Sequence, residues 1–82
     1  MSVTLDDRKV FYGVLENMSQ GYQDDLKTKV AFEDGSKFNE LFNGLCSVGM
    51  ITCGVDGLLK ERYRVTELGK KQIKSYLLVY NS

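Results

Sequence analysis

Histidine and proline are absent from this 82-residue chain, and only two cysteines are present. Without histidine, neither a Cys/His zinc site nor a cysteine–histidine nucleophile can be assembled. The two thiols, Cys46 and Cys53, are also too few for a disulfide framework. We expect both to be reduced and buried, with a disulfide between subunits as the alternative.

Catalytic constellations are missing as well. The acidic residues are scattered over expected helix starts and turns, so they do not form the pair that acid–base catalysis would need. No glycine-rich phosphate loop follows a strand. We therefore expect no enzyme activity, no catalytic residue, no cofactor and no metal site.

Long apolar runs are lacking too, so no segment has the length that spanning a membrane requires. The start, MSVTLDDRK, does not show the basic-then-apolar pattern of a signal peptide. We expect a cytoplasmic protein without a membrane partner. No repeat, low-complexity segment or linker divides the chain, whose length suits one small domain with a modest core.

Charge is balanced, with eleven basic and eleven acidic residues and a net charge of zero. Proteins that bind nucleic acids usually carry a basic excess, because phosphate contacts supply much of their affinity. Here the charge is unevenly placed: residues 1–25 are mainly acidic and residues 57–75 mainly basic. This pattern favours one basic face rather than a basic protein.

Apolar residues recur at helical spacing in the first half of the chain and predict three helices, over about 6–20, 24–32 and 36–48. Gly21 is expected to stop the first helix. Asp24 or Asp25 is expected to cap the second, and Ser36 the third. The third helix has an apolar stripe formed by Phe38, Leu41, Phe42, Leu45 and Val48.

The hydrophobic period then changes to that of a β-hairpin. MITCGV predicts a strand, Asp56-Gly57 a two-residue turn with positive φ, and LLKERYRV the returning strand. Strand alternation would place Lys60, Arg62 and Arg64 on one side of that hairpin. These side chains could bind phosphates, or they could form a solvated face of the hairpin.

The last segment, from Glu67 to about Tyr80, predicts a helix capped by Thr66. SYLLVY is also β-prone, so a strand stays open as the alternative. The segment is more apolar than one face of a helix requires, and we expect it to contribute a dimer interface or, alternatively, to pack on the first helix. The residues expected at that interface are Ile73, Tyr76, Leu77 and Tyr80.

Three stretches resemble parts of a winged helix–turn–helix domain: LKTKVAFEDGSKFNELFNGL, LFNGLCSVGMI and YRVTELGKKQI. The last is similar to the end of the wing in winged-helix transcription regulators such as the MarR and PadR families, where the Thr caps the final helix and the Gly allows close packing. The resemblance covers about residues 8–74. It implies a mainly α fold with a small β-hairpin: a three-helix core, a β wing and a C-terminal helix. The single domain would span 1–82, with 67–80 as a dimerisation helix.

The resemblance implies sequence-specific binding of double-stranded DNA by a small homodimeric transcription regulator, with the third helix in the major groove. The expected DNA-binding residues are Ser36, Lys37, Asn39, Glu40, Asn43, Lys60, Arg62 and Arg64. Asparagine can read adenine, whereas Glu40 would repel phosphate unless it accepts a hydrogen bond from cytosine. The alternative is a winged helix that binds another protein, as an adaptor or as an inhibitor of a larger machine.

Overall fold

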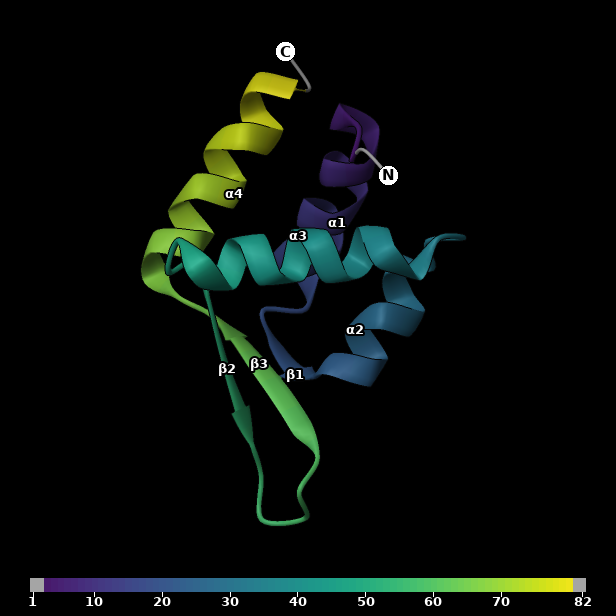
Figure 1. Ribbon diagram of the computed structural model, residues 1–82. Helices are drawn as coiled ribbons and strands as arrows, with labels where there is room; N and C mark the ends of the chain where they lie inside the picture. The colour runs from purple at the N-terminus through teal and green to yellow at the C-terminus, as the bar shows by residue number, and fades with distance from the viewer. Residues whose placement is uncertain (1–2, 81–82) are drawn as a thin grey trace.

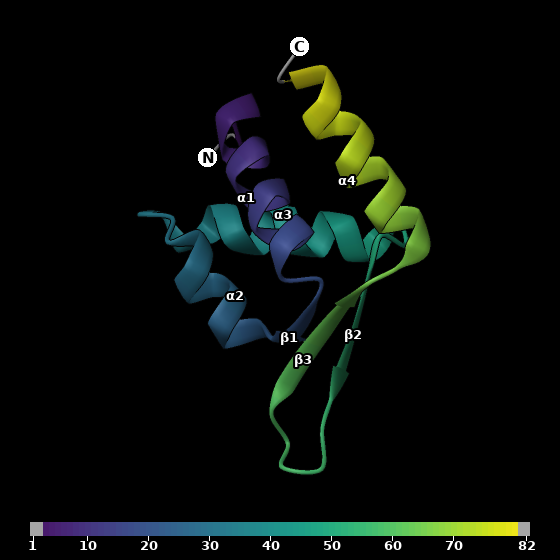
Figure 2. The ribbon, with the colours of Figure 1, turned by 180° about the vertical axis from the view of Figure 1, so that it is seen from behind.

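The fold consists of four helices and a three-stranded sheet (Figure 1); the computed structural model describes residues 3–80. In chain order the elements are α1 (Leu5–Asn17), β1 (Gln20–Tyr22), α2 (Gln23–Val30), α3 (Gly35–Ser47), β2 (Ile51–Val55), β3 (Glu61–Val65) and α4 (Glu67–Tyr80). The strands are antiparallel in the order β1-β3-β2. Figures 1 and 2 show α1 and α4 at one end of the molecule, with the β2–β3 hairpin projecting from the other.

The core lies where α1, α2 and α3 meet the sheet and α4. Aromatic rings form its centre: the centroid of Phe38 lies 5.5 Å from those of both Phe11 and Phe42. Such ring pairs contribute about 0.5–1.5 kcal/mol each beyond the burial of their area. None of the helices in the described part of the chain has the length and apolarity that crossing a bilayer requires.

The first helix is shorter than predicted, because β1 takes the residues expected at its end. Gly21 does not stop a helix; it lies in β1 opposite Tyr63, with φ 151°. The Tyr63 hydroxyl donates a 2.6 Å hydrogen bond to the carbonyl oxygen of Met18. Pairing with β3, far along the chain, therefore overrides the local helical tendency of Ser19 and Gln20.

Both expected N-caps are wrong. Neither Asp24 nor Asp25 caps α2: the N-cap position is Tyr22, which makes no side-chain cap bond, and both acids lie in the first turn. In α3 the cap is Asp34 rather than Ser36, and its side chain accepts from the Ser36 amide at 2.9 Å. An acidic cap at this position contributes about 1 kcal/mol.

The prediction of a two-residue turn at Asp56-Gly57 is also wrong. Val55 pairs with Glu61, so residues 56–60 form the connection. The Asp56 side chain accepts from the amides of Leu58 (2.8 Å) and Lys60 (3.0 Å), and the positive φ of 60° falls on Leu59. The carboxylate replaces a tight glycine turn with a longer loop, which removes Lys60 from the strand.

The last segment is the predicted helix, and the strand alternative is wrong. The Thr66 hydroxyl oxygen accepts from the Gly69 amide at 3.0 Å, which confirms the expected cap. The same hydroxyl donates to the carbonyl oxygen of Gly49 at 2.7 Å. A Cβ built on Gly69 would lie 2.1 Å from the Met50 carbonyl oxygen, so only glycine allows α4 to sit this close to the α3–β2 connection.

Two further expectations about burial are wrong. Cys53 is exposed and Cys46 is half-buried, although both thiols are free. Val48, expected on the apolar stripe of α3, is 60% exposed, because the helix ends at Ser47 before the stripe completes another turn. The remaining stripe residues are buried: Phe38, Leu41, Phe42 and Leu45.

Candidate nucleic-acid interface

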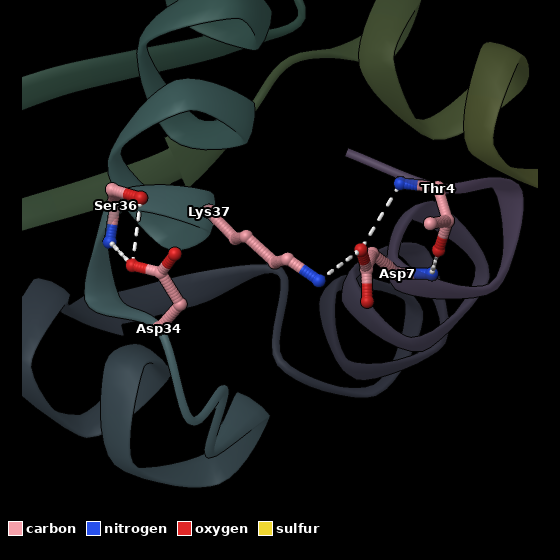
Figure 3. Close-up of polar contacts among 5 residues, drawn as sticks. All are labelled: Thr4, Asp7, Asp34, Ser36 and Lys37. Atoms are coloured by element: carbon pink, nitrogen blue, oxygen red, sulfur yellow. Dashed lines mark hydrogen bonds and ion pairs between the residues drawn. The ribbon is translucent and has the colours of Figure 1, made fainter. Parts of the chain in front are cut away.

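The N-terminus of α3 is ordered by Asp34, whose carboxylate oxygen accepts from both the hydroxyl (2.7 Å) and the amide of Ser36 (Figure 3). These two hydrogen bonds hold the pKa of Asp34 below its ordinary value. Ser36 is exposed, but its hydroxyl proton is already donated to Asp34. Towards a ligand, the hydroxyl therefore serves mainly as an acceptor.

The single cation of α3 points towards another helix. The Lys37 ammonium nitrogen lies 2.9 Å from a carboxylate oxygen of Asp7 in α1 (Figure 3). Asp7 also accepts from the Thr4 amide in the capping box of α1, and this bond, with the Lys37 contact, lowers the pKa of Asp7. Lys37 therefore joins the start of α3 to the start of α1.

The outward face of α3 is polar. Ser36, Asn39, Glu40 and Asn43 are all exposed, and they occupy the side of the helix opposite its buried stripe. The structure thus brings together four of the eight residues predicted to bind DNA. Their face carries one negative charge, from Glu40, and two amides that can both donate and accept hydrogen bonds.

The arginines of β3 lie on the other side of the sheet from α3. Tyr63 is buried and packs edge-on against Phe42 of α3, and its strand partner Cys53 touches Cys46 of α3. Neighbours along a strand point to opposite faces, so Arg62 and Arg64 project away from α3. Seven of the eight predicted DNA-binding residues therefore divide into two separate patches, and the eighth, Lys37, is paired with Asp7.

Lys60, Arg62 and Arg64 form the second patch, called the basic patch below, and the Tyr22 ring lies beside two of them. The guanidinium carbon of Arg62 lies 4.6 Å from the Tyr22 ring centroid, and the Lys60 ammonium 5.6 Å from it. Cations over an exposed aromatic face gain about 0.5–1 kcal/mol each. Although Lys60 belongs to the loop, this ring keeps it beside Arg62. Arg64 lies one row away, between Gln20 and Thr52 on the neighbouring strands.

The sequence does not predict the roles of two residues beside this patch. Tyr22 gives no strand signal, because QGY is too short to stand out and its partner β3 lies about forty residues away. The sequence predicts Asp56 in a tight turn, whereas its side-chain hydrogen bonds shape a longer loop. The Asp-Gly pair is a signal for both arrangements.

The expected dimer residues are largely occupied within one chain. Ile73 is 2% exposed and belongs to the core. The Tyr76 ring packs edge-on against Tyr12 of α1 at 5.0 Å, and its hydroxyl donates to the carbonyl oxygen of Leu5. Leu77 is half-buried against the core, and the Tyr80 hydroxyl donates to Asp6. The alternative expectation, packing of this segment on α1, describes these contacts.

The helix order, the three-stranded sheet and the projecting hairpin define a winged helix. Two crystal structures share this fold: a MarR-family transcriptional regulator from Silicibacter pomeroyi with a TM-score of 0.68, and one from Silicibacter pomeroyi DSS-3 with a TM-score of 0.64. Each regulator is 15% identical to this chain in sequence. The match covers 96% of this chain and 55% of each regulator. No protein-family model matches the chain, and neither does any curated protein.

Proposed function

We propose that this domain binds double-stranded DNA as a small transcription regulator. The observation that carries the proposal is the exposed polar face of α3 on a winged-helix framework, with Asn39 and Asn43 one helical turn apart. An α-helix fits the major groove, where the amide of asparagine can pair with adenine. The two similar structures are transcriptional regulators, which supports this choice among the functions of the fold.

The basic patch would contact the DNA backbone beyond the groove that α3 enters. Lys60, Arg62 and Arg64 are exposed and project from the opposite side of the sheet, so they would reach different phosphates from those beside α3. Each phosphate contact releases condensed counterions and adds about 0.9 to the slope of log affinity against log salt.

Two copies of the domain would place two α3 helices on successive half-sites. A homodimer formed through α4 would need residues that are not already packed on α1. Leu68 and Leu78 meet this condition, since they are 49% and 65% exposed. Leu78→Glu should then yield a folded monomer, with the mass measured by sedimentation and the helix content by circular dichroism. A parent that sediments as a monomer at high concentration would rule out the dimer.

A salt titration of parent and variants tests the DNA proposal. Arg62→Ala and Arg64→Ala should weaken binding to a selected site and to a scrambled duplex equally, and flatten the salt slope. Asn43→Ala should cost roughly 1–3 kcal/mol on the selected site alone, with the slope unchanged. Lys71→Ala, which removes an exposed cation from α4, is the matched control and should leave both affinities unchanged. Absence of binding to any duplex at low salt would refute the proposal.

A second candidate function is recognition of another protein. It is favoured by the charge of α3, because Lys37 is paired with Asp7 and Glu40 is exposed. Glu40→Gln separates the two functions. If α3 enters DNA, loss of this charge should strengthen nonspecific duplex binding, because repulsion from phosphate is removed. If the helix binds a protein only, the variant should gain no affinity for any duplex.

A further inference from the structure

The two thiols lie together at the junction of α3 and the hairpin. Cys46 is in the last turn of α3 and Cys53 is in the middle of β2, seven positions further along the chain. Their sulfur atoms are 2.8 Å apart. A disulfide bond is ~2.05 Å long, so the sulfurs need to approach by only about 0.8 Å to form one.

We propose that Cys46 and Cys53 form a redox-active dithiol that hydroperoxides oxidise to an intramolecular disulfide. In the first step the Cys53 sulfur attacks the terminal oxygen of the hydroperoxide, forming a sulfenic acid on Cys53 and releasing an alcohol, or water from hydrogen peroxide. In the second step the Cys46 sulfur attacks that sulfenic sulfur and displaces its oxygen as water. Overall, two thiols and one hydroperoxide give one disulfide, one alcohol and one water.

Exposure assigns the two roles. Cys53 is exposed, so an oxidant can reach it directly, whereas Cys46 is half-buried. Burial, followed by the hydrogen bond with Cys53, raises the pKa of Cys46 to about 12, so this thiol keeps its proton at neutral pH. The hydroperoxide therefore meets Cys53 first, and Cys46, whose sulfur lies 2.8 Å away, resolves the intermediate.

The disulfide would fasten α3 to β2. Cys46 lies one helical turn beyond Asn43, so the bond would restrain the part of α3 that carries this amide. An effect of oxidation on DNA affinity rests on the proposed function. The oxidation itself does not rest on it, and the two are measured separately.

The oxidation is tested by treating the whole reduced chain with hydrogen peroxide or tert-butyl hydroperoxide and measuring its mass and free thiols. We expect the mass of a single chain less two hydrogen atoms and no free thiol, and a dithiol reductant should restore both thiols. Because the bond closes a short loop, the melting temperature should rise by up to about 10 °C. A disulfide between two chains, or thiols that stay free, would overturn the proposal.

Single variants test the roles. With the same dose of hydroperoxide, Cys46→Ser should accumulate a sulfenic acid on Cys53 that dimedone traps, because no resolving thiol remains. Cys53→Ser should give no dimedone adduct, and the reverse pattern would overturn the assignment. Duplex affinity of the reduced and oxidised parent is then compared. Disulfide formation with no DNA binding in either form would refute the proposed function and leave the dithiol assignment intact.

Discussion

Among the eight glycines, Gly69 is the one where an added methyl group meets the closest contacts. A Cβ at this residue would lie 2.1 Å from the carbonyl oxygen of Met50 and 2.9 Å from a methyl carbon of Val65. The carbonyl belongs to the backbone and accepts a hydrogen bond from the Thr66 amide at 2.9 Å, so it cannot rotate away freely. Gly69→Ala must therefore push α4 away from the α3–β2 connection.

The magnitude follows from two opposing effects. Overpacking of a well-packed contact costs typically 1–3 kcal/mol and sometimes more, and backbone contact places this site at the upper end. Alanine has a higher helix propensity than glycine, and this difference offsets at most about 1 kcal/mol of the overpacking cost. We expect a net loss of about 2 kcal/mol in the free energy of unfolding, which lowers the melting temperature of a domain this size by about 8–16 °C.

Gly13→Ala provides the matched control, because it makes the same substitution within a helix where the added Cβ meets nothing within 4 Å beyond its chain neighbours and the helix's own backbone. This variant should gain about 0.5–1 kcal/mol. Urea and thermal unfolding, followed by circular dichroism, would measure both variants. If Gly69→Ala is as stable as Gly13→Ala, the close approach of α4 is not a constraint and the reasoning fails.

Further predictions concern the caps and the hairpin loop. Asp34→Ala should lower stability by about 1 kcal/mol in urea unfolding at neutral pH, because α3 loses its N-cap. Hydrogen bonds hold the pKa of Asp7, Asp34 and Asp56 below the ordinary 3.8, so their stabilisation is complete above that pH and lost as the pH falls through the lower folded values. Urea midpoints should therefore fall as the pH drops below about 4, and a flat profile would contradict these bonds. Leu59→Gly should stabilise the loop by about 1 kcal/mol, since Leu59 has φ 60°, whereas Leu58→Gly should not.

Local signals in the sequence determined most of the helical framework. The stripe from Phe38 to Leu45 repeats at the helical period, and it is buried as that period predicts. Thr66 and Gly69 are separated by the three positions that a cap and its bonded amide require, and this spacing was readable as the start of α4. In each case the interacting residues lie within a few positions of one another, so the chain pattern alone carries the information.

Only the tertiary structure decided the features that join distant segments. β1 exists because Gln20–Tyr22 pairs with β3, and that pairing places Tyr22 under Arg62 and Lys60. The contact between Lys37 and Asp7 depends on how α3 crosses α1, which no local pattern specifies.

The position of the arginines relative to α3 is also decided by contacts between distant segments. Strand alternation placed Arg62 and Arg64 on one face, but which face meets α3 depends on the burial of Tyr63 against Phe42. The approach of Cys46 to Cys53 follows from that same packing, because Cys53 lies opposite Tyr63 in the sheet. Side-chain periodicity defines the faces of an element, whereas burial against its neighbours determines where each face points.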